Sequence, residues 1–204
     1  MRFYHNAFSS NSRRALMTAL HLDVKLDIEV VNLQKGEQRS PDMLRMNPNG
    51  KVPVLEDDGF LLWESHAIMQ YLADRTPGQT VYPVELRARA DVNRWLFWSA
   101  NHWSPSVSIL NWENFVKGLI GDGAPDPAQV KRGEAQVTDC ATLLDAHLAG
   151  KTWVAQEKLT LADLALAAPL MTVVPAKLPV SGYPNLLAWF GRVQELDAWK
   201  KTSL

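Results

Sequence analysis

The chain has 204 residues, of which 47% are hydrophobic, and its 21 basic and 22 acidic side chains leave a formal net charge of −1. This composition suits one or two compact soluble domains, and a charge near zero excludes the electrostatic footprint of a nucleic-acid or acidic-membrane binder. The N-terminus lacks the apolar stretch of a signal peptide, and the most apolar segment, residues 159–180, is too interrupted to span a bilayer. We therefore expect a cytoplasmic protein without nucleic-acid or membrane partners.

The first part of the chain alternates predicted strands and helices. Helical spacing of Ala15, Leu16, Ala19 and Leu20 predicts the first helix, and the turn at residues 57–59 predicts a hairpin. In chain order we predict a strand at 2–5, a helix at 11–22, a strand at 26–33, a short helix at 41–46, strands at 52–56 and 60–63, and a helix at 65–74.

The second part of the chain is predicted to be entirely helical. Residues 76–83 are rich in turn formers and form a linker between a domain at 1–77 and a domain at 84–204. Helices are expected at 85–116 and 128–148, with further helices that open near Thr160 and Pro184. Thr160 and Asp163 form a variant capping box, so Asp163 is expected to serve folding.

Cysteine and histidine usage narrows the possible chemistry. The single cysteine, Cys140, excludes an intrachain disulfide and dithiol exchange, so any thiol chemistry must use a thiol that the ligand brings. The five histidines lack metal-ligand spacing, and we expect neither a metal nor another cofactor.

Two short motifs lie close together in the sequence. Val52-Pro53 puts a proline inside an apolar run, where it belongs at a strand start or edge because it cannot donate to a sheet ladder. Backbone groups beside it are then free to pair with an extended peptide. Glu64-Ser65 opens a predicted helix, whose N-terminus can bind an anion.

The segments Asn47-Pro-Asn-Gly-Lys-Val-Pro-Val-Leu55 and Glu64-Ser-His-Ala-Ile68 resemble the glutathione transferase family, in its cytosolic, serine-type and bacterial-like form. The resemblance implies an α/β thioredoxin-like N-terminal domain followed by an all-α helical-bundle C-terminal domain. It also implies a cytoplasmic detoxification enzyme, usually a homodimer, that joins glutathione, used as a co-substrate, to small apolar electrophiles.

A hydroxyl near the first helix would stabilise the glutathione thiolate. Tyr4 and Ser9 have the spacing that serine-type members show between the tyrosine of the first strand and the active serine, so Ser9 is the preferred donor. Ser10 is adjacent and could share the role. Tyr4 occupies the position of the catalytic tyrosine in tyrosine-type members. In a further alternative, the serines only cap the helix.

The resemblance also implies the residues that hold glutathione. Val52, fixed by Pro53, would pair with the cysteinyl backbone, as in β-augmentation. Glu64 would take the γ-glutamyl ammonium, and Ser65 the γ-glutamyl carboxylate. Three further candidates are Gln38 and Lys51, toward the glycyl carboxylate, and His66, which follows Ser65 where several relatives carry arginine.

The second substrate is expected to meet aromatic side chains. Phe8 lies beside Ser9, while Trp103 and Trp112, near Pro105, are the preferred tryptophans for a pocket that accepts an apolar electrophile.

Two other functions fit the same motifs. The run Ser9-Ser10-Asn11-Ser12 is similar to that of maleylacetoacetate isomerases, although Asn11 and Glu64 depart from their pattern. A transferase-like chain can also be a non-catalytic binding module.

Overall fold

The computed structural model describes residues 1–203, which form two compact units. The first comprises Met1–Tyr82 together with the chain from Asp197 onward, and the second comprises Pro83–Leu196. The linker predicted from the sequence puts all residues from 84 onward in the second domain, whereas the structure groups the segment that begins at Asp197 with the first unit. Among the described residues, no helix combines the length and apolar character needed to cross a membrane.

The first unit is built on a four-stranded mixed sheet with strand order β2-β1-β3-β4. β1 (Arg2–His5) pairs in parallel with β2 (Asp27–Val30) and antiparallel with β3 (Val54–Asp57), which pairs antiparallel with β4 (Phe60–Trp63). Each strand was predicted, but β2 and β3 are shorter than expected. β3 begins after Pro53 because proline has no N–H to offer the ladder.

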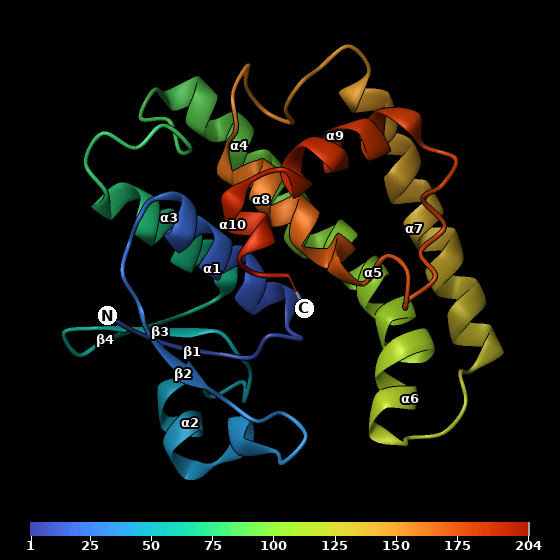
Figure 1. The fold of residues 1–204 in the computed structure, drawn as a ribbon, viewed down its shortest axis with the longest axis horizontal. Helices are drawn as coiled ribbons and strands as arrows, with labels where there is room; N and C mark the ends of the chain where they lie inside the picture. The colour runs from blue at the N-terminus through green and yellow to red at the C-terminus, as the bar shows by residue number, and fades with distance from the viewer. Residues whose placement is uncertain (204) are drawn as a thin grey trace. The chain divides into compact units, whose positions relative to one another are not determined.

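Helices lie on both faces of this sheet (Figure 1). α1 (Ser10–His21) and α3 (Ser65–Arg75) pack against each other on one face, and α2 (Pro41–Met46) lies on the other, after the 3₁₀ turn η1 (Glu37–Arg39). The apolar cluster on the α2 side contains Val31, Met43, Val52 and Val54, with Tyr4 packed against it.

The last helix of the chain completes the first unit. α10 (Asp197–Lys200) packs on α1, where the Arg13 guanidinium lies over the Trp199 ring at 3.7 Å from its centroid. Arg13 also donates to the Trp199 carbonyl at 3.2 Å and to the Thr202 hydroxyl at 3.2 Å. Arg13 therefore links the start of α1 to the C-terminal segment.

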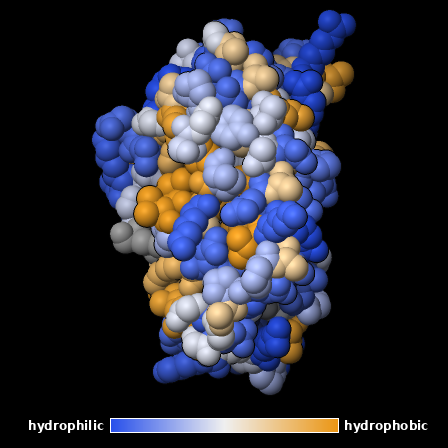
Figure 2. All heavy atoms as spheres, turned by 90° about the vertical axis from the view of Figure 1, so that its right-hand side faces the viewer, coloured by the Kyte–Doolittle hydropathy of each residue, from blue (hydrophilic) through white to orange (hydrophobic). Residues whose placement is uncertain are grey.

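The second unit is helical throughout. A continuous helical run comprises α4 (Leu86–Trp98), a π-helical turn η2 (Ser99–Trp103), α5 (Ser104–Asn111), a second π-helical turn η3 (Trp112–Val116) and α6 (Lys117–Ile120). α7 (Pro127–Leu148), α8 (Leu161–Ala167), the 3₁₀ turn η4 (Ala168–Thr172) and α9 (Pro184–Gln194) complete it. Figure 2, which shows the side where α7 lies in Figure 1, displays apolar patches separated by polar side chains.

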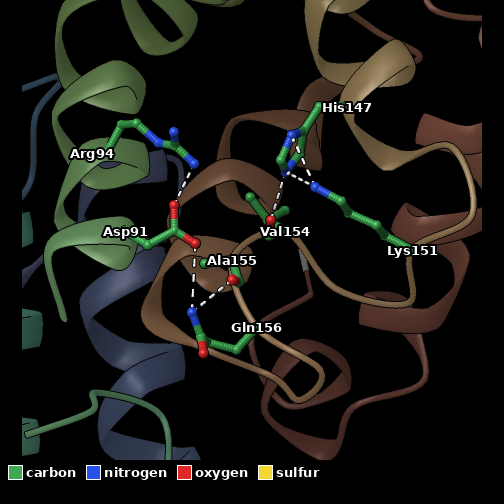
Figure 3. A network of polar contacts seen from close by, with 7 residues as sticks. All are labelled: Asp91, Arg94, His147, Lys151, Val154, Ala155 and Gln156. Carbon is green, nitrogen blue, oxygen red and sulfur yellow. Dashed lines mark hydrogen bonds and ion pairs between the residues drawn. The ribbon is translucent and has the colours of Figure 1, made fainter. Parts of the chain in front are cut away.

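Polar contacts fix the segment between α7 and α8 (Figure 3). His147, near the end of α7, contacts the Val154 carbonyl at 2.6 Å, and the Lys151 ammonium lies 3.2 Å from the same ring. Gln156 reaches α4, where its Nε2 lies 3.5 Å from Asp91, which also pairs with Arg94.

Asp163 joins three parts of the second unit. It is fully buried, and its carboxylate accepts from the Val154 and Thr160 N–H groups, each at 2.8 Å, and from the Trp189 indole at 2.9 Å. The predicted capping contact is therefore present, but the carboxylate also accepts hydrogen bonds from Val154 and Trp189, which lie outside α8. Removal of the Asp163 carboxylate would leave several buried donors without an acceptor. The loss in free energy of unfolding should therefore exceed the loss that a missing helix cap causes.

We expect Asp163→Ala to lower the free energy of unfolding by about 3–5 kcal/mol, measured by urea denaturation. Asp126→Ala is the matched control, because Asp126 caps the exposed start of α7 by accepting from the Ala128 N–H at 2.8 Å, and its loss costs about 1 kcal/mol. Equal losses in the two variants would contradict the assigned role of Asp163.

Gly133 lets α5 and α7 approach closely, since a Cβ built there would lie 2.9 Å from Leu110 side-chain atoms. Gly133→Ala should therefore destabilise the protein by about 1–3 kcal/mol despite the better helix propensity of alanine. A Cβ at Gly118 of α6 would meet nothing within 4 Å, so Gly118→Ala should be neutral or stabilising when the free energies of unfolding of both variants are measured by urea denaturation. A stable Gly133→Ala protein would show that the helices can separate at little cost.

Candidate functional site

Strand register brings three segments to one end of the sheet in the first unit. Val54 pairs with Tyr4 on one side and with Trp63 on the other. The chain continues from Tyr4 into the loop before α1, from Trp63 into α3, and reaches Val54 through Val52-Pro53. The predicted thiolate donor, the peptide edge and the anion-binding helix start therefore adjoin the same end of the sheet.

The loop that leads to Ser9 is held by Asn6, a residue that the sequence analysis did not single out. The Asn6 amide donates to the Val31 carbonyl at 2.9 Å, its side-chain oxygen accepts from the Phe8 N–H at 2.9 Å, and its carbonyl accepts from the Ser9 N–H at 3.1 Å. Asparagine close after a strand is a common turn residue, and that was the only available signal.

Ser9 is half-buried and forms the N-cap of α1. Its Oγ accepts from the Ser12 N–H at 3.2 Å, and its carbonyl accepts from the Arg13 N–H at 2.9 Å. A hydroxyl can accept and donate at once, so the capping bond leaves the Ser9 proton able to donate to a ligand. Ser10, the first residue of α1, is also half-buried.

Tyr4 points to another part of the sheet. It packs with the cluster on the α2 side, and its hydroxyl lies 3.0 Å from a carboxylate oxygen of Glu56, to which it donates. Glu56 pairs with Arg2 in the register, farther from the end where Ser9 lies. This geometry does not favour Tyr4 as the thiolate donor.

The peptide edge has free backbone groups. The Val52-Pro53 bond is cis, as the sequence analysis allowed, and both residues are buried. The N–H and C=O of Val52 form no hydrogen bond with any residue in 1–203. Asn47, buried and missed by the sequence analysis, donates its amide to the Lys51 carbonyl at 2.8 Å and so supports the turn.

The start of α3 has an unusual backbone. Glu64 has φ 71° and ψ 107°, outside the regions that a side-chain-bearing residue prefers, and its side chain is exposed. Such a conformation costs about 1–3 kcal/mol and is common where a ligand is held. Ser65, 5% exposed, begins α3, whose first N–H groups favour an anion.

His66 contacts the protein interior. The Arg14 guanidinium lies 3.0 Å from His66 Nε2, and arginine can only donate, so this nitrogen accepts. Burial, and then the charge of Arg14, lower the pKa of His66 to about 2, which keeps the ring neutral. Arg14 is 1% exposed, and burial lowers its pKa to about 9, so it remains a cation at neutral pH.

The remaining predicted residues differ in exposure. Gln38 lies in η1, where its Oε1 is buried without a hydrogen-bond partner among the described residues, and Lys51 is exposed. Phe8 is 51% exposed in the first unit, and Trp112 is 42% exposed in the second. Within residues 1–203, no group of three or more His, Cys, Asp or Glu residues could hold a metal ion.

Trp103 occupies a different place from the one the sequence predicted. Its ring is fully buried in the second unit, and its indole N–H donates to the Leu166 carbonyl at 2.8 Å. The structure therefore makes it a core residue rather than a surface for a ligand. Its helical spacing was compatible with either role.

Comparisons with known proteins agree with this geometry. Residues 8–75 match the family model described as "Glutathione S-transferase, N-terminal domain", and residues 109–197 match "Glutathione S-transferase, C-terminal domain".

Solved structures match nearly the whole length of the chain. A delta-class glutathione transferase of Nilaparvata lugens is 30% identical with a TM-score of 0.83, the alignment covering 99% of this chain and 94% of that one. Glutathione transferase F7 of Populus trichocarpa is 25% identical with a TM-score of 0.91 over 98% and 96% of the two chains. These matches confirm the expected thioredoxin-like domain followed by an all-α domain, and the chain belongs to the glutathione transferase family.

Proposed function

We propose that this protein binds reduced glutathione at the end of the sheet beside Val52 and conjugates its thiolate to a small apolar electrophile. The observation that carries the proposal is the unpaired backbone of Val52, which adjoins the start of α1 and the start of α3. An extended tripeptide can complete this edge with main-chain hydrogen bonds. The γ-glutamyl carboxylate then meets the N-terminus of α3 at Ser65, and its ammonium group meets Glu64.

Ser9 supports the ionisation of the thiol. A free cysteine thiol has a pKa of about 8.5, so only a few per cent is thiolate at neutral pH. The Ser9 hydroxyl accepts from the Ser12 N–H and can donate its own proton to the sulfur. The N-terminus of α1 contributes positive potential in the same direction, since Ser9 is its N-cap.

The reaction needs no redox change in the protein. The thiolate sulfur donates an electron pair to the electrophilic carbon, a carbon–sulfur bond forms, and the leaving group departs with its electron pair or the added group takes up a proton. The chain holds and orients the thiolate for this attack. Phe8, exposed one residue before Ser9, offers an apolar surface for the electrophile. Contact with Trp112, a homodimer and a role in detoxification stay predictions.

Isothermal titration calorimetry with reduced glutathione, followed by a conjugation assay with a halo-nitrobenzene, tests the proposal. Binding with turnover is the expected result. Binding without turnover would favour a non-catalytic module, and absence of binding would overturn the proposed function. Maleylacetoacetate is the comparison substrate, since its preferential turnover would indicate an isomerase.

Ser9→Ala is expected to raise the pKa of the bound glutathione thiol by about one to two units and to lower kcat/KM at pH 6.5 about 10- to 100-fold. Thiolate absorbance at 240 nm, followed against pH, measures the pKa. Affinity for S-methylglutathione, which has no ionisable thiol, should stay near the wild-type value. A large loss in Ser10→Ala with little change in Ser9→Ala would transfer the role to Ser10.

Ser65→Ala is expected to weaken glutathione binding about tenfold, because it removes a hydroxyl donor to a carboxylate at the start of α3. Calorimetric Kd values measure the loss. Ser40→Ala is the control, because Ser40 also caps a helix of the first unit, where it accepts from the Met43 N–H at 3.3 Å, but α2 lies on the other face of the sheet. Similar Kd values for Ser65→Ala and the wild type would remove Ser65 from the site.

A further inference from the structure

Two adjacent arginines of α1 are buried and point to different parts of the first unit. Arg13 is 5% exposed and contacts the C-terminal segment, whereas Arg14 is 1% exposed and contacts His66, the second residue of α3. Burial of a guanidinium costs desolvation free energy, so we expect its contacts to compensate that cost or to contribute to function. The two side chains provide a natural pair for comparison.

Arg14 lies close to both helix starts in the proposed glutathione site. It is four residues after Ser10 on α1, which corresponds to about 6 Å along the helix axis. Its guanidinium reaches His66, two residues after the strained Glu64 and one after Ser65. One side chain therefore connects the helix that begins at the thiolate donor with the helix that begins at the carboxylate pocket.

The contact with His66 leaves the positive charge in place. The ring accepts a hydrogen bond as a neutral group, so it orients the guanidinium without neutralising it. The exposed carboxylate of Glu64 interacts with Arg14 through charge, which favours the charged form of the arginine. In a buried environment such a charge acts over longer distances than at the surface.

We propose that Arg14 is a positioning residue for glutathione, which ties the start of α3 to α1 through His66 and supplies positive potential behind the thiolate and the γ-glutamyl carboxylate. This inference rests on the proposed function. Glutathione, with two carboxylates and one ammonium, is already net negative at neutral pH, and ionisation of its thiol adds a further negative charge, so a fixed cation in the protein beside it favours both binding and ionisation.

The test compares Arg14→Met, Arg14→Lys and Arg13→Met by calorimetry with glutathione, thiolate absorbance against pH and thermal unfolding. Arg14→Met should raise Kd about tenfold and the pKa of the bound thiol by about one unit, because the charge is lost. Arg14→Lys keeps the positive charge, so the pKa of the bound thiol should lie close to the wild-type value. Arg13→Met and Arg14→Met should lower the melting temperature by similar amounts. Arg13→Met should move the pKa of the bound thiol by less than half of the shift expected in Arg14→Met.

His66→Leu covers the case in which Arg14→Met does not fold. This variant keeps the Arg14 cation but removes the ring nitrogen that accepts from it, and it should raise the Kd for glutathione at least about threefold. A wild-type Kd in His66→Leu would overturn the inference in that case. Equal shifts of the thiol pKa in Arg13→Met and Arg14→Met would also overturn it, since they would indicate a general effect of losing a buried guanidinium. Failure of the wild type to bind glutathione would instead overturn the proposed function, and this inference with it.

Discussion

The double pairing of Val54 is the constraint on which the proposed site depends. One residue holds β1 on one side and β4 on the other, so the loop before α1, the cis Val52-Pro53 step and the start of α3 must meet at one end of the sheet. A shift of one residue in either pairing would turn alternate side chains to the opposite face and separate these segments. The close packing of Val54 and Leu55, both fully buried, opposes such a shift, because each side chain fills a space of different shape.

The polar features of this site are mostly backbone groups rather than reactive side chains. The unpaired groups of Val52 and the N-termini of α1 and α3 are products of the fold, and each is oriented before any ligand arrives. Preorganised dipoles stabilise charge without reorganisation, which suits the proposed function, in which the ligand brings the nucleophile. The strained backbone of Glu64 costs stability, and the buried sheet and helices around it offset that cost.

Local patterns in the sequence predicted most of the strands and helices, whereas the thioredoxin-like topology was predicted from the resemblance of the two short motifs to a known family. Short apolar runs and periodicity located every strand and most helices, and α3 begins directly after Glu64 as predicted, whereas β3 begins at Val54 rather than at Val52. The direction of a side chain depends on packing between distant elements and has no local signal. Arg13 and Arg14 are the same residue type at adjacent positions, yet they contact different neighbours. The sequence around Trp103 likewise does not distinguish a ligand pocket from the core, where the structure places its ring.

The membership of α10 in the first unit has a consequence for synthesis. Trp199 and Thr202 contact Arg13 only after the ribosome has made the whole second unit, which separates them from α1 in the chain. Arg13, one turn after the Ser9 cap, consequently stays in contact with water on this side until residues 197–202 have been synthesised. The first unit therefore cannot complete its packing around Arg13 before the segment that begins at Asp197 has been synthesised.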